Sequence, residues 1–153
     1  QGIFGPGVDT TEDARRLVDA CLYAPLGARG LGGAPRAAEY ANMADRDYIE
    51  QANSQMLVVA FLEHAVAIEN LDEILAVEGI DAVYVGPQDM SMSLGLPGQP
   101  GHPRVQEIDA RVREAAKAAG KRYATDLIVA DRASNFFLNG ISAFLDANRD
   151  RLS

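Results

Sequence analysis

The chain has 153 residues, and its 14 Lys and Arg against 22 Asp and Glu give a formal net charge of −8 at pH 7. This balance disfavours nucleic-acid binding, which needs clustered positive charge. With 48% hydrophobic and 24% charged residues, the composition is that of a globular protein and excludes intrinsic disorder. No apolar run approaches the ~20 residues that span a bilayer, and the start of the chain shows no leader pattern, so we expect a cytoplasmic protein without a membrane partner.

Hydrophobic periodicity predicts alternating strands and helices. A short apolar stub, Ile3-Phe4-Gly5, comes first. Asp9 and Thr10 are then N-cap candidates for a helix expected over 12–21. A loop rich in Gly and Pro follows, and a polar helical stretch is expected after it. The loop covers 25–35 and the helical stretch 36–53.

The continuous apolar run 56–62 is typical of a strand buried on both faces of a parallel sheet, and 81–85 is predicted as a second buried strand. An amphipathic helix is expected between them over 65–77. A second loop rich in Gly and Pro covers 91–103. The elements predicted after it are a helix over 105–119, a strand over 123–129, a helix over 131–138 and a strand over 141–145.

These elements make about five βα units, which indicates an α/β fold with a parallel sheet. We treat residues 1–153 as a single domain. A complete eight-stranded βα barrel takes ~250 residues, so the chain is short of one by roughly three units. It is therefore either an open doubly wound sheet or a partial barrel completed by other residues or another chain. A partial barrel exposes unpaired strand edges, so we expect a homo-oligomer or a partner chain that completes it.

Ligand sites of parallel βα folds lie at the carboxyl ends of the strands, so acids at those positions are candidates. Glu63 directly follows the first buried run, and Asp89 follows the second after a Gly-Pro turn. Two carboxylates at one rim are hard oxygen ligands that suit Mg²⁺ or Mn²⁺. The alternative is that both acids stand at helix starts, where the helix dipole stabilises them.

Other chemistry-bearing residues form weaker patterns. His64 and His102 make no spaced pair, and we expect them to pack at the surface or in a loop. Arg29, in a Gly-rich loop, would hold a carboxylate or cap a neighbouring helix. The glycines match neither a phosphate loop nor the dinucleotide pattern, and no G-x-S-x-G elbow occurs.

Four segments together resemble the HpcH/HpaI aldolase family in order and spacing, from Gly5 to about Gly140. They are PGVDTTEDAR (6–15), YAPLGARGLGG (23–33), Glu63 with ENLDEI (69–74), and VEGIDAVYVGPQDMS (77–91). The resemblance implies a partial (β/α)8 TIM barrel that lacks its N-terminal units. It also implies the chemistry of metal-dependent class II pyruvate aldolases.

In that family, the acids that match Glu63 and Asp89 hold Mg²⁺, Mn²⁺ or Co²⁺. The ion binds a 2-oxo acid and polarises its carbonyl, so the resemblance implies retro-aldol release of pyruvate and an aldehyde from a 4-hydroxy-2-oxo acid.

The resemblance also implies residues that bind the substrate. Backbone amides near Gly86, Pro87 and Gln88, and at the helix start after Thr10, are expected to receive the substrate carboxylate. Arg29 is expected to contribute to substrate binding.

The sequence also departs from the family pattern. The family's catalytic Arg and its His-Asp base are expected in strands before Gln1. Phe61 stands where the family commonly has Gln, and YATD (123–126) and LDAN (145–148) stand where its later strands carry Gly. Two alternatives therefore stay open: a non-catalytic or repurposed truncated barrel subunit, or a related reaction such as decarboxylation or carbon–carbon bond formation.

Overall fold

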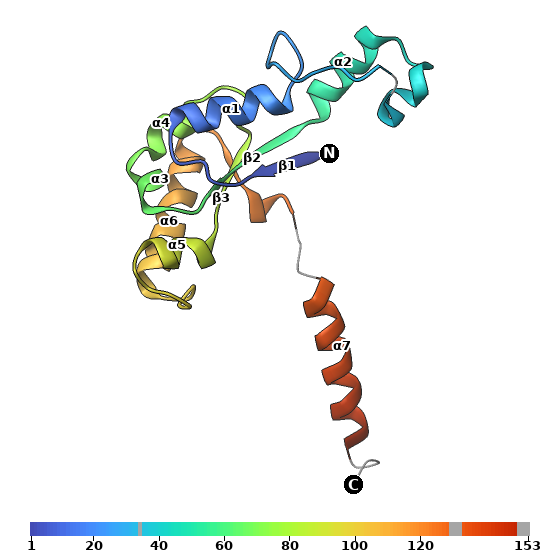
Figure 1. The fold of residues 1–153 in the computed structure, drawn as a ribbon. Helices are drawn as coiled ribbons and strands as arrows, with labels where there is room; N and C mark the ends of the chain where they lie inside the picture. Colours follow the sequence, from blue (N-terminus) through green and yellow to red (C-terminus); the bar gives the residue numbers. More distant parts are fainter. Residues whose placement is uncertain (34, 129–132, 150–153) are drawn as a thin grey trace.

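The sheet is parallel, as the sequence predicts. The computed structural model describes residues 1–33, 35–128 and 133–149. In the described residues, four strands lie side by side in chain order (Figure 1). They are β1 (Gly2–Gly5), β2 (Leu57–Leu62), β3 (Ala82–Val85) and β4 (Arg122–Tyr123). A strand order that follows the chain without reversal belongs to an arc of a βα barrel, not to a doubly wound sheet.

The outer face of the sheet packs against helices. Val58, Ala60 and Leu62 alternate along β2 and are fully buried. With Val83 and Val85 of β3 they belong to one hydrophobic cluster that includes side chains from several helices. Among these helices are α1 (Thr11–Cys21), α4 (Leu71–Leu75) and α6 (Pro103–Ala118). Burial of this face against the helices is the main stabilising contribution to the fold.

The inner face, which lines the interior of a barrel, carries aromatic side chains. Phe61 of β2 is in register with Tyr84 of β3, and their ring centroids are 5.2 Å apart. Phe4 of β1 lies 6.2 Å from Tyr84 and is 41% exposed. This row of rings lies directly below the strand ends that carry the candidate acids.

Two predicted helices are interrupted. The stretch 36–53 is not one helix but η1 (Arg36–Ala41) and α2 (Asp45–Gln55). Inside η1, Glu39, Tyr40 and Ala41 take left-handed backbone angles, with φ of 52°, 55° and 72°, so this segment is kinked and does not continue as one right-handed helix.

The stretch 65–77 likewise divides into α3 (Ala65–Glu69) and α4. The break falls at Asn70, whose side-chain amide donates to the Asp9 carbonyl oxygen at 2.9 Å. A contact with the loop after β1 therefore coincides with the break in this helix.

A short helix missed by the sequence analysis, α5 (Pro87–Ser93), follows β3 directly. Pro87 occupies its first turn, where the missing N–H costs nothing and the fixed φ suits a helix. The loop predicted from Ser91 onward therefore begins later, after this helix ends.

The end of the chain differs most from the prediction. The strand predicted over 123–129 is limited to β4, because η2 (Ala124–Asp126) turns the chain. The helix predicted over 131–138 is confirmed for residues 133–138, and positions 129–132 lie outside the described residues. The helix does not end there: α7 (Ala133–Asn148) continues through 141–145, so the strand predicted over 141–145 is wrong.

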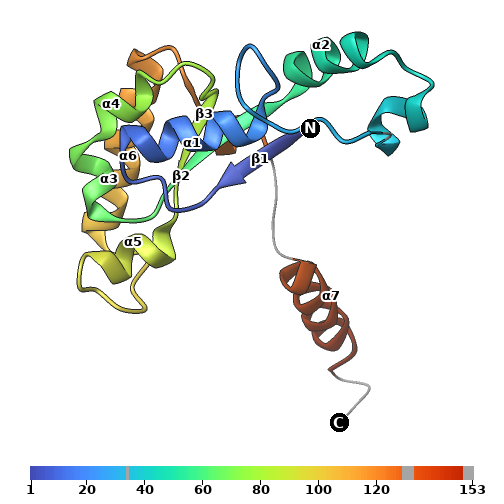
Figure 2. The ribbon, with the colours of Figure 1, turned by 45° about the horizontal axis from the view of Figure 1, so that its top comes forward.

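A helix satisfies its own backbone hydrogen bonds, whereas a fifth strand would have to pair with the two residues of β4. Figures 1 and 2 both show α7 set apart from the sheet and its helices. Within the described ranges, no helix has the length and hydropathy needed to cross a bilayer.

Candidate metal centre

Glu63 and Asp89 follow neighbouring parallel strands at the same edge of the sheet. Glu63 comes directly after β2, and Asp89 is the third residue of α5, which begins one residue after β3. The Gly86 amide donates to the Leu62 carbonyl oxygen at 2.9 Å, so the strand pairing continues up to the rim. The structure thus places both acids on adjacent strand ends, where the sequence predicts them.

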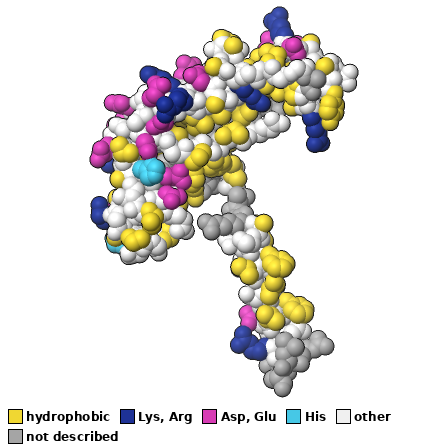
Figure 3. All heavy atoms as spheres, viewed as in Figure 1, with side chains coloured by type: hydrophobic (Ala, Val, Ile, Leu, Met, Phe, Trp, Pro, Cys, Tyr) yellow, Lys and Arg dark blue, Asp and Glu magenta, His cyan; other side chains and the backbone are white. Residues whose placement is uncertain are grey.

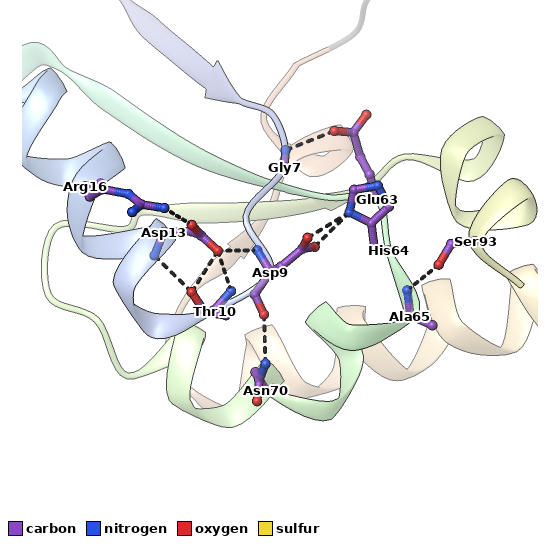
Figure 4. A network of polar contacts seen from close by, with 10 residues as sticks. All are labelled: Gly7, Asp9, Thr10, Asp13, Arg16, Glu63, His64, Ala65, Asn70 and Ser93. Atoms are coloured by element: carbon purple, nitrogen blue, oxygen red, sulfur yellow. Dashed lines mark hydrogen bonds and ion pairs between the residues drawn. The ribbon is translucent and has the colours of Figure 1, made fainter.

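The Glu63 side chain is half-buried and is held by the loop after β1. The Gly7 amide donates to Glu63 Oε2 at 3.0 Å (Figure 4). The other carboxylate oxygen, Oε1, accepts no hydrogen bond from the described residues. Glu63 precedes His64, the N-cap of α3, so the helix-start alternative does not account for it.

Asp89 is exposed and lies in the first turn of α5. Its carboxylate makes no hydrogen bond or ion pair within the described ranges. The helix dipole favours a negative charge at this position, so the helix-start alternative holds for this residue. The dipole stabilises the negative charge of the Asp89 carboxylate without a hydrogen bond to its oxygens, so both oxygens stay free to bind a ligand.

The donor set fits a hard divalent ion. In the part of the chain that the structure describes, no group of three or more His, Cys, Asp and Glu side chains gathers closely enough to hold a metal. Two carboxylates are nevertheless the number that Mg²⁺ commonly takes from a protein, with water and substrate oxygens completing its octahedron. Free oxygens on Glu63 and Asp89 meet that requirement.

His64 lies beside this site but points elsewhere. Its Nδ1 atom lies 2.8 Å from Asp9 Oδ2, whereas the Glu63 side chain reaches toward Gly7 (Figure 4). The His64 side chain is 49% exposed, as expected of a surface position. The pairing with Asp9 joins residues 55 positions apart, so no local sequence pattern predicts it. His102 is the N-cap of α6, and its Nδ1 accepts from the Arg104 amide in the first turn of that helix.

Comparisons with known proteins identify the architecture around this site. The model of the family HpcH/HpaI aldolase/citrate lyase matches residues 1–148. The chain belongs to this family.

Among sequence relatives, 2-keto-3-deoxy-L-rhamnonate aldolases of Salmonella paratyphi B (strain ATCC BAA-1250 / SPB7) and Salmonella newport (strain SL254) are each 44% identical over 154 aligned positions. Each alignment covers 95% of this chain and 57% of the relative. The chain therefore spans little more than half the length of these aldolases.

Several solved structures resemble the chain as well. The citrate synthase SbnG has a TM-score of 0.78 and 26% identity, over 98% of this chain and 63% of that one. The HpcH/HpaI aldolase from Desulfitobacterium hafniense DCB-2 has a TM-score of 0.68 and 34% identity, over 90% of this chain and 52% of the aldolase. Macrophomate synthase has a TM-score of 0.66 and 27% identity, over 80% of this chain and 44% of the synthase. The likenesses confirm a partial barrel of this family.

In this HpcH/HpaI chain, Thr10 holds the start of α1. Its hydroxyl accepts from the Asp13 amide at 3.2 Å, and its own amide donates to Asp13 Oδ2 at 2.9 Å, which makes a capping box. The hydrogen bond from the Thr10 side chain holds the pKa of Asp13 below its ordinary value of 3.8. The amides of Asp9 and Thr10 are thus engaged within their own turn, and substrate binding through Thr10 stays a prediction.

The residues before Asp89 offer fewer free amides than the sequence analysis expects. The Gly86 amide already donates to Leu62, and Pro87 has no N–H. Gln88 is exposed, and its amide stands in the first turn of α5, where no partner exists within the helix. The amides of Gln88 and Asp89 are therefore the donors that this turn can offer to a carboxylate.

Arg29 lies away from the rim. Its guanidinium donates to the Cys21 carbonyl oxygen at 3.4 Å and lies 4.5 Å from the centre of the Tyr23 ring. Cys21 ends α1, which begins at the strand-end rim and runs back along the sheet. The structure therefore supports the helix-capping alternative for Arg29 and does not bring it to Glu63 and Asp89.

Proposed function

We propose that the chain carries the metal-binding rim of a metal-dependent carbon–carbon lyase that acts on 2-oxo acids. The reaction is retro-aldol cleavage of a 4-hydroxy-2-oxo acid: the bond between C3 and C4 breaks, pyruvate forms from C1–C3, and C4 leaves as an aldehyde. The observation that carries the proposal is the pair of carboxylates, Glu63 and Asp89, at neighbouring strand ends with oxygens free to bind.

Each residue of the rim has a defined part in this proposal. Glu63 and Asp89 would hold Mg²⁺, Mn²⁺ or Co²⁺, and such an ion polarises the carbonyl of the 2-oxo acid. The amides of Gln88 and Asp89 would donate to the substrate carboxylate. Gly7 holds the Glu63 carboxylate in place through its amide. The Salmonella relatives indicate 2-keto-3-deoxy-L-rhamnonate, a 4-hydroxy-2-oxo acid, as the first substrate to test.

A related reaction is the second candidate. Phe61 lies below the rim and cannot donate to or accept from a substrate oxygen or a metal-bound water. Among the similar structures are proteins named as a citrate synthase and macrophomate synthase. This likeness supports carbon–carbon bond formation at the same pair of acids, with decarboxylation as a further variant. A non-catalytic or repurposed subunit is the third candidate.

The exposed surfaces support assembly with another chain, either a second copy or a partner that completes the barrel. β1 and β4 each have one unpaired edge in the described sheet, and such edges invite pairing. Hydrophobic side chains also run along α7 (Figure 3). Phe136, Phe137 and Phe144 on this helix are each at least 65% exposed.

Metal binding and turnover test the proposal together. Mn²⁺ binding to the purified chain is measured by electron paramagnetic resonance, with Glu63→Gln, Asp89→Asn and the exposed control Asp72→Asn. Pyruvate release from 2-keto-3-deoxy-L-rhamnonate is then followed with and without Mn²⁺. We expect each rim variant to weaken Mn²⁺ binding at least tenfold and the control to leave it unchanged.

The outcomes separate the three candidates. Mn²⁺-dependent pyruvate release supports the lyase. Mn²⁺ binding without release, but with consumption of a 2-oxo acid in the presence of an acceptor, favours the second candidate. Absence of Mn²⁺ binding, or binding that neither rim variant weakens, overturns the metal site and favours the non-catalytic subunit.

A further inference from the structure

The ring of Phe61 and the side chain of Glu63 share the space above Gly86. Residues 61 and 63 are two apart at the end of β2, so their side chains leave the same face of the sheet. A methyl group on the Gly86 Cα would come within 2.8 Å of Phe61 Cε2 and 2.9 Å of Glu63 Cγ. Both side chains therefore press against the bare backbone of Gly86 and lie side by side.

The Phe61 ring is itself fixed from two directions. Tyr84 of β3 lies beside it, with ring centroids 5.2 Å apart, and the backbone of Gly86, directly after β3, lies against its far end. The Phe61 carbonyl oxygen accepts from the Val8 amide at 3.2 Å, which ties this residue to the loop that carries Gly7. A ring held in this way is a rigid wall beside the Glu63 stem.

From this packing we propose that Phe61 is a positioning residue for the Glu63 carboxylate. A free glutamate side chain samples several staggered rotamers. Here the ring blocks those that turn toward the inner face of the sheet, and the side chain is left in the rotamer that accepts from Gly7 at 3.0 Å. Oε2 is engaged there, so Oε1 stays free for the ion. The proposal rests on the proposed function only for the identity of that ion.

The first test needs no metal and reads the contact between Glu63 and Gly7. The Gly7 amide resonance is assigned by NMR, and its change on Glu63→Gln is measured in two backgrounds, the unmodified chain and Phe61→Ala. Comparing the same replacement in both backgrounds removes the direct effect of the aromatic ring on the resonance. We expect Glu63→Gln to shift the Gly7 amide resonance clearly in the unmodified chain. In the Phe61→Ala background, we expect the same replacement to give at most half of that shift.

The matched control is Phe4→Ala, which removes the same ring from the same sheet face. Phe4 contacts Tyr84, but the three atoms nearest to a Cβ placed on Gly86 belong to Phe61 and Glu63 and not to Phe4. In the Phe4→Ala background, the Gly7 shift on Glu63→Gln is expected to keep its full size. Where Phe61→Ala fails to fold, Phe61→Leu replaces it, because leucine keeps apolar bulk at the position without the flat ring.

The second test measures Mn²⁺ affinity by electron paramagnetic resonance. Residues that orient a metal ligand typically contribute 10–100-fold to affinity, so we expect a loss of about tenfold or more for Phe61→Ala and none for Phe4→Ala. Gly86→Ala should also weaken binding, since its methyl group displaces both side chains. In the double variant, Phe61→Ala with Gly86→Ala, the new methyl group fills space that the ring has vacated. The loss of Mn²⁺ binding free energy in this variant should therefore be smaller than the sum of the losses in the two single variants.

The two tests fail in different ways. A Gly7 shift that keeps its size in the Phe61→Ala or Phe61→Leu background overturns the positioning role, whatever the metal does. A halved shift in a chain that binds no Mn²⁺ supports the positioning role and overturns the proposed function. A third outcome is that Phe61→Ala binds Mn²⁺ as tightly as the unmodified chain while Glu63→Gln binds it more weakly. This outcome overturns only the link between the ring and the metal site.

Discussion

The Nδ1 atom of His64 lies 2.8 Å from Oδ2 of Asp9, and this contact joins the β1–α1 loop to the end of β2. Asn70 adds a second link through its hydrogen bond to the Asp9 carbonyl oxygen. The loop held in this way carries Gly7, whose amide donates to Glu63. The position of a candidate metal ligand therefore depends on a contact between two side chains that bind no metal themselves.

Replacing Asp9 by Ala should free this loop with little loss of overall stability. Exposed pairs of this kind contribute about 0–1 kcal/mol, and Asn70 still bonds the backbone. We expect the Gly7 amide to exchange its proton several-fold faster, as measured by hydrogen exchange. The exposed α4 variant Asp72→Ala is the control, and equal exchange rates in both variants would contradict the role of the pair.

The capping box of α1 should make stability depend on pH at the acidic end. The hydrogen bond from Thr10 lowers the pKa of Asp13 below 3.8, so the ionised form stabilises the folded state. This contribution is complete above the pKa of the unfolded chain and is lost as pH falls through the lower pKa of the folded state. We expect Asp13→Asn to lower the urea midpoint at pH 7, and the difference to shrink below pH 3.8. A difference that stays constant over this range would contradict the assignment.

Tyr123 should behave as a buried, neutral phenol. Its hydroxyl donates to Asp109 and accepts from the Val85 amide at 3.2 Å, and burial is the main cause that raises its pKa above 10.0. Tyr123→Phe leaves the Val85 amide without this partner, at a cost of about 1–3 kcal/mol in the free energy of unfolding.

The raised pKa of Tyr123 also predicts how the stability of the fold changes at alkaline pH. Above pH 10.0 the unfolded chain releases this proton while the folded chain keeps it, so stability should fall as pH rises. Urea unfolding at pH 9 and pH 11 measures the fall, which should be smaller in Tyr123→Phe. An equal fall in both proteins would show that Tyr123 is not its source.

The apolar side chains of α7 should drive association. Phe137 and Phe144 are 70% and 66% exposed, and a contiguous apolar surface of this kind marks an interaction site. We expect the unmodified chain to form oligomers in light scattering and Phe137→Ser combined with Phe144→Ser to shift the mass toward the monomer. As a control on the same helix, Ser142→Ala should leave the mass unchanged. A monomeric unmodified chain would contradict the expectation.

The strands β2 and β3 and the rim positions of both acids could be predicted because their pattern is local. A continuous apolar run identifies β2 without knowledge of its neighbours, and the acid that ends the run is then placed by the rule that sites lie at carboxyl ends. This rule places Glu63 and Asp89 at the rim, whereas their metal-binding role comes from the family resemblance and stays a prediction. The family resemblance could likewise be read from short motifs in fixed order.

The contacts that orient those acids could not be predicted in the same way. The pairing of Asp9 with His64 and the packing of Phe61 on Gly86 join residues far apart in sequence, and no spacing rule encodes them. The wrong strand over 141–145 has a similar cause. Apolar residues at Ile141 and Leu145 suit a strand or a helix, and the choice depends on whether a neighbouring edge exists to pair with.

The placement of the two rim acids has a consequence for folding. β2 and β3 are neighbours in the sheet and are joined by a single crossover through α3 and α4, and Asp89 follows in the very next helix. Closing this one loop is therefore enough to bring Glu63 and Asp89 together, and short loops carry a low entropic cost of closure. The crossovers that bring β1 and β4 to this pair of strands are longer, so the pairing of β2 with β3 carries the lowest entropic cost of loop closure in the described sheet. We expect the two carboxylates to meet before the outer strands of the sheet have docked, so that a divalent ion can stabilise a folding nucleus as well as the finished rim.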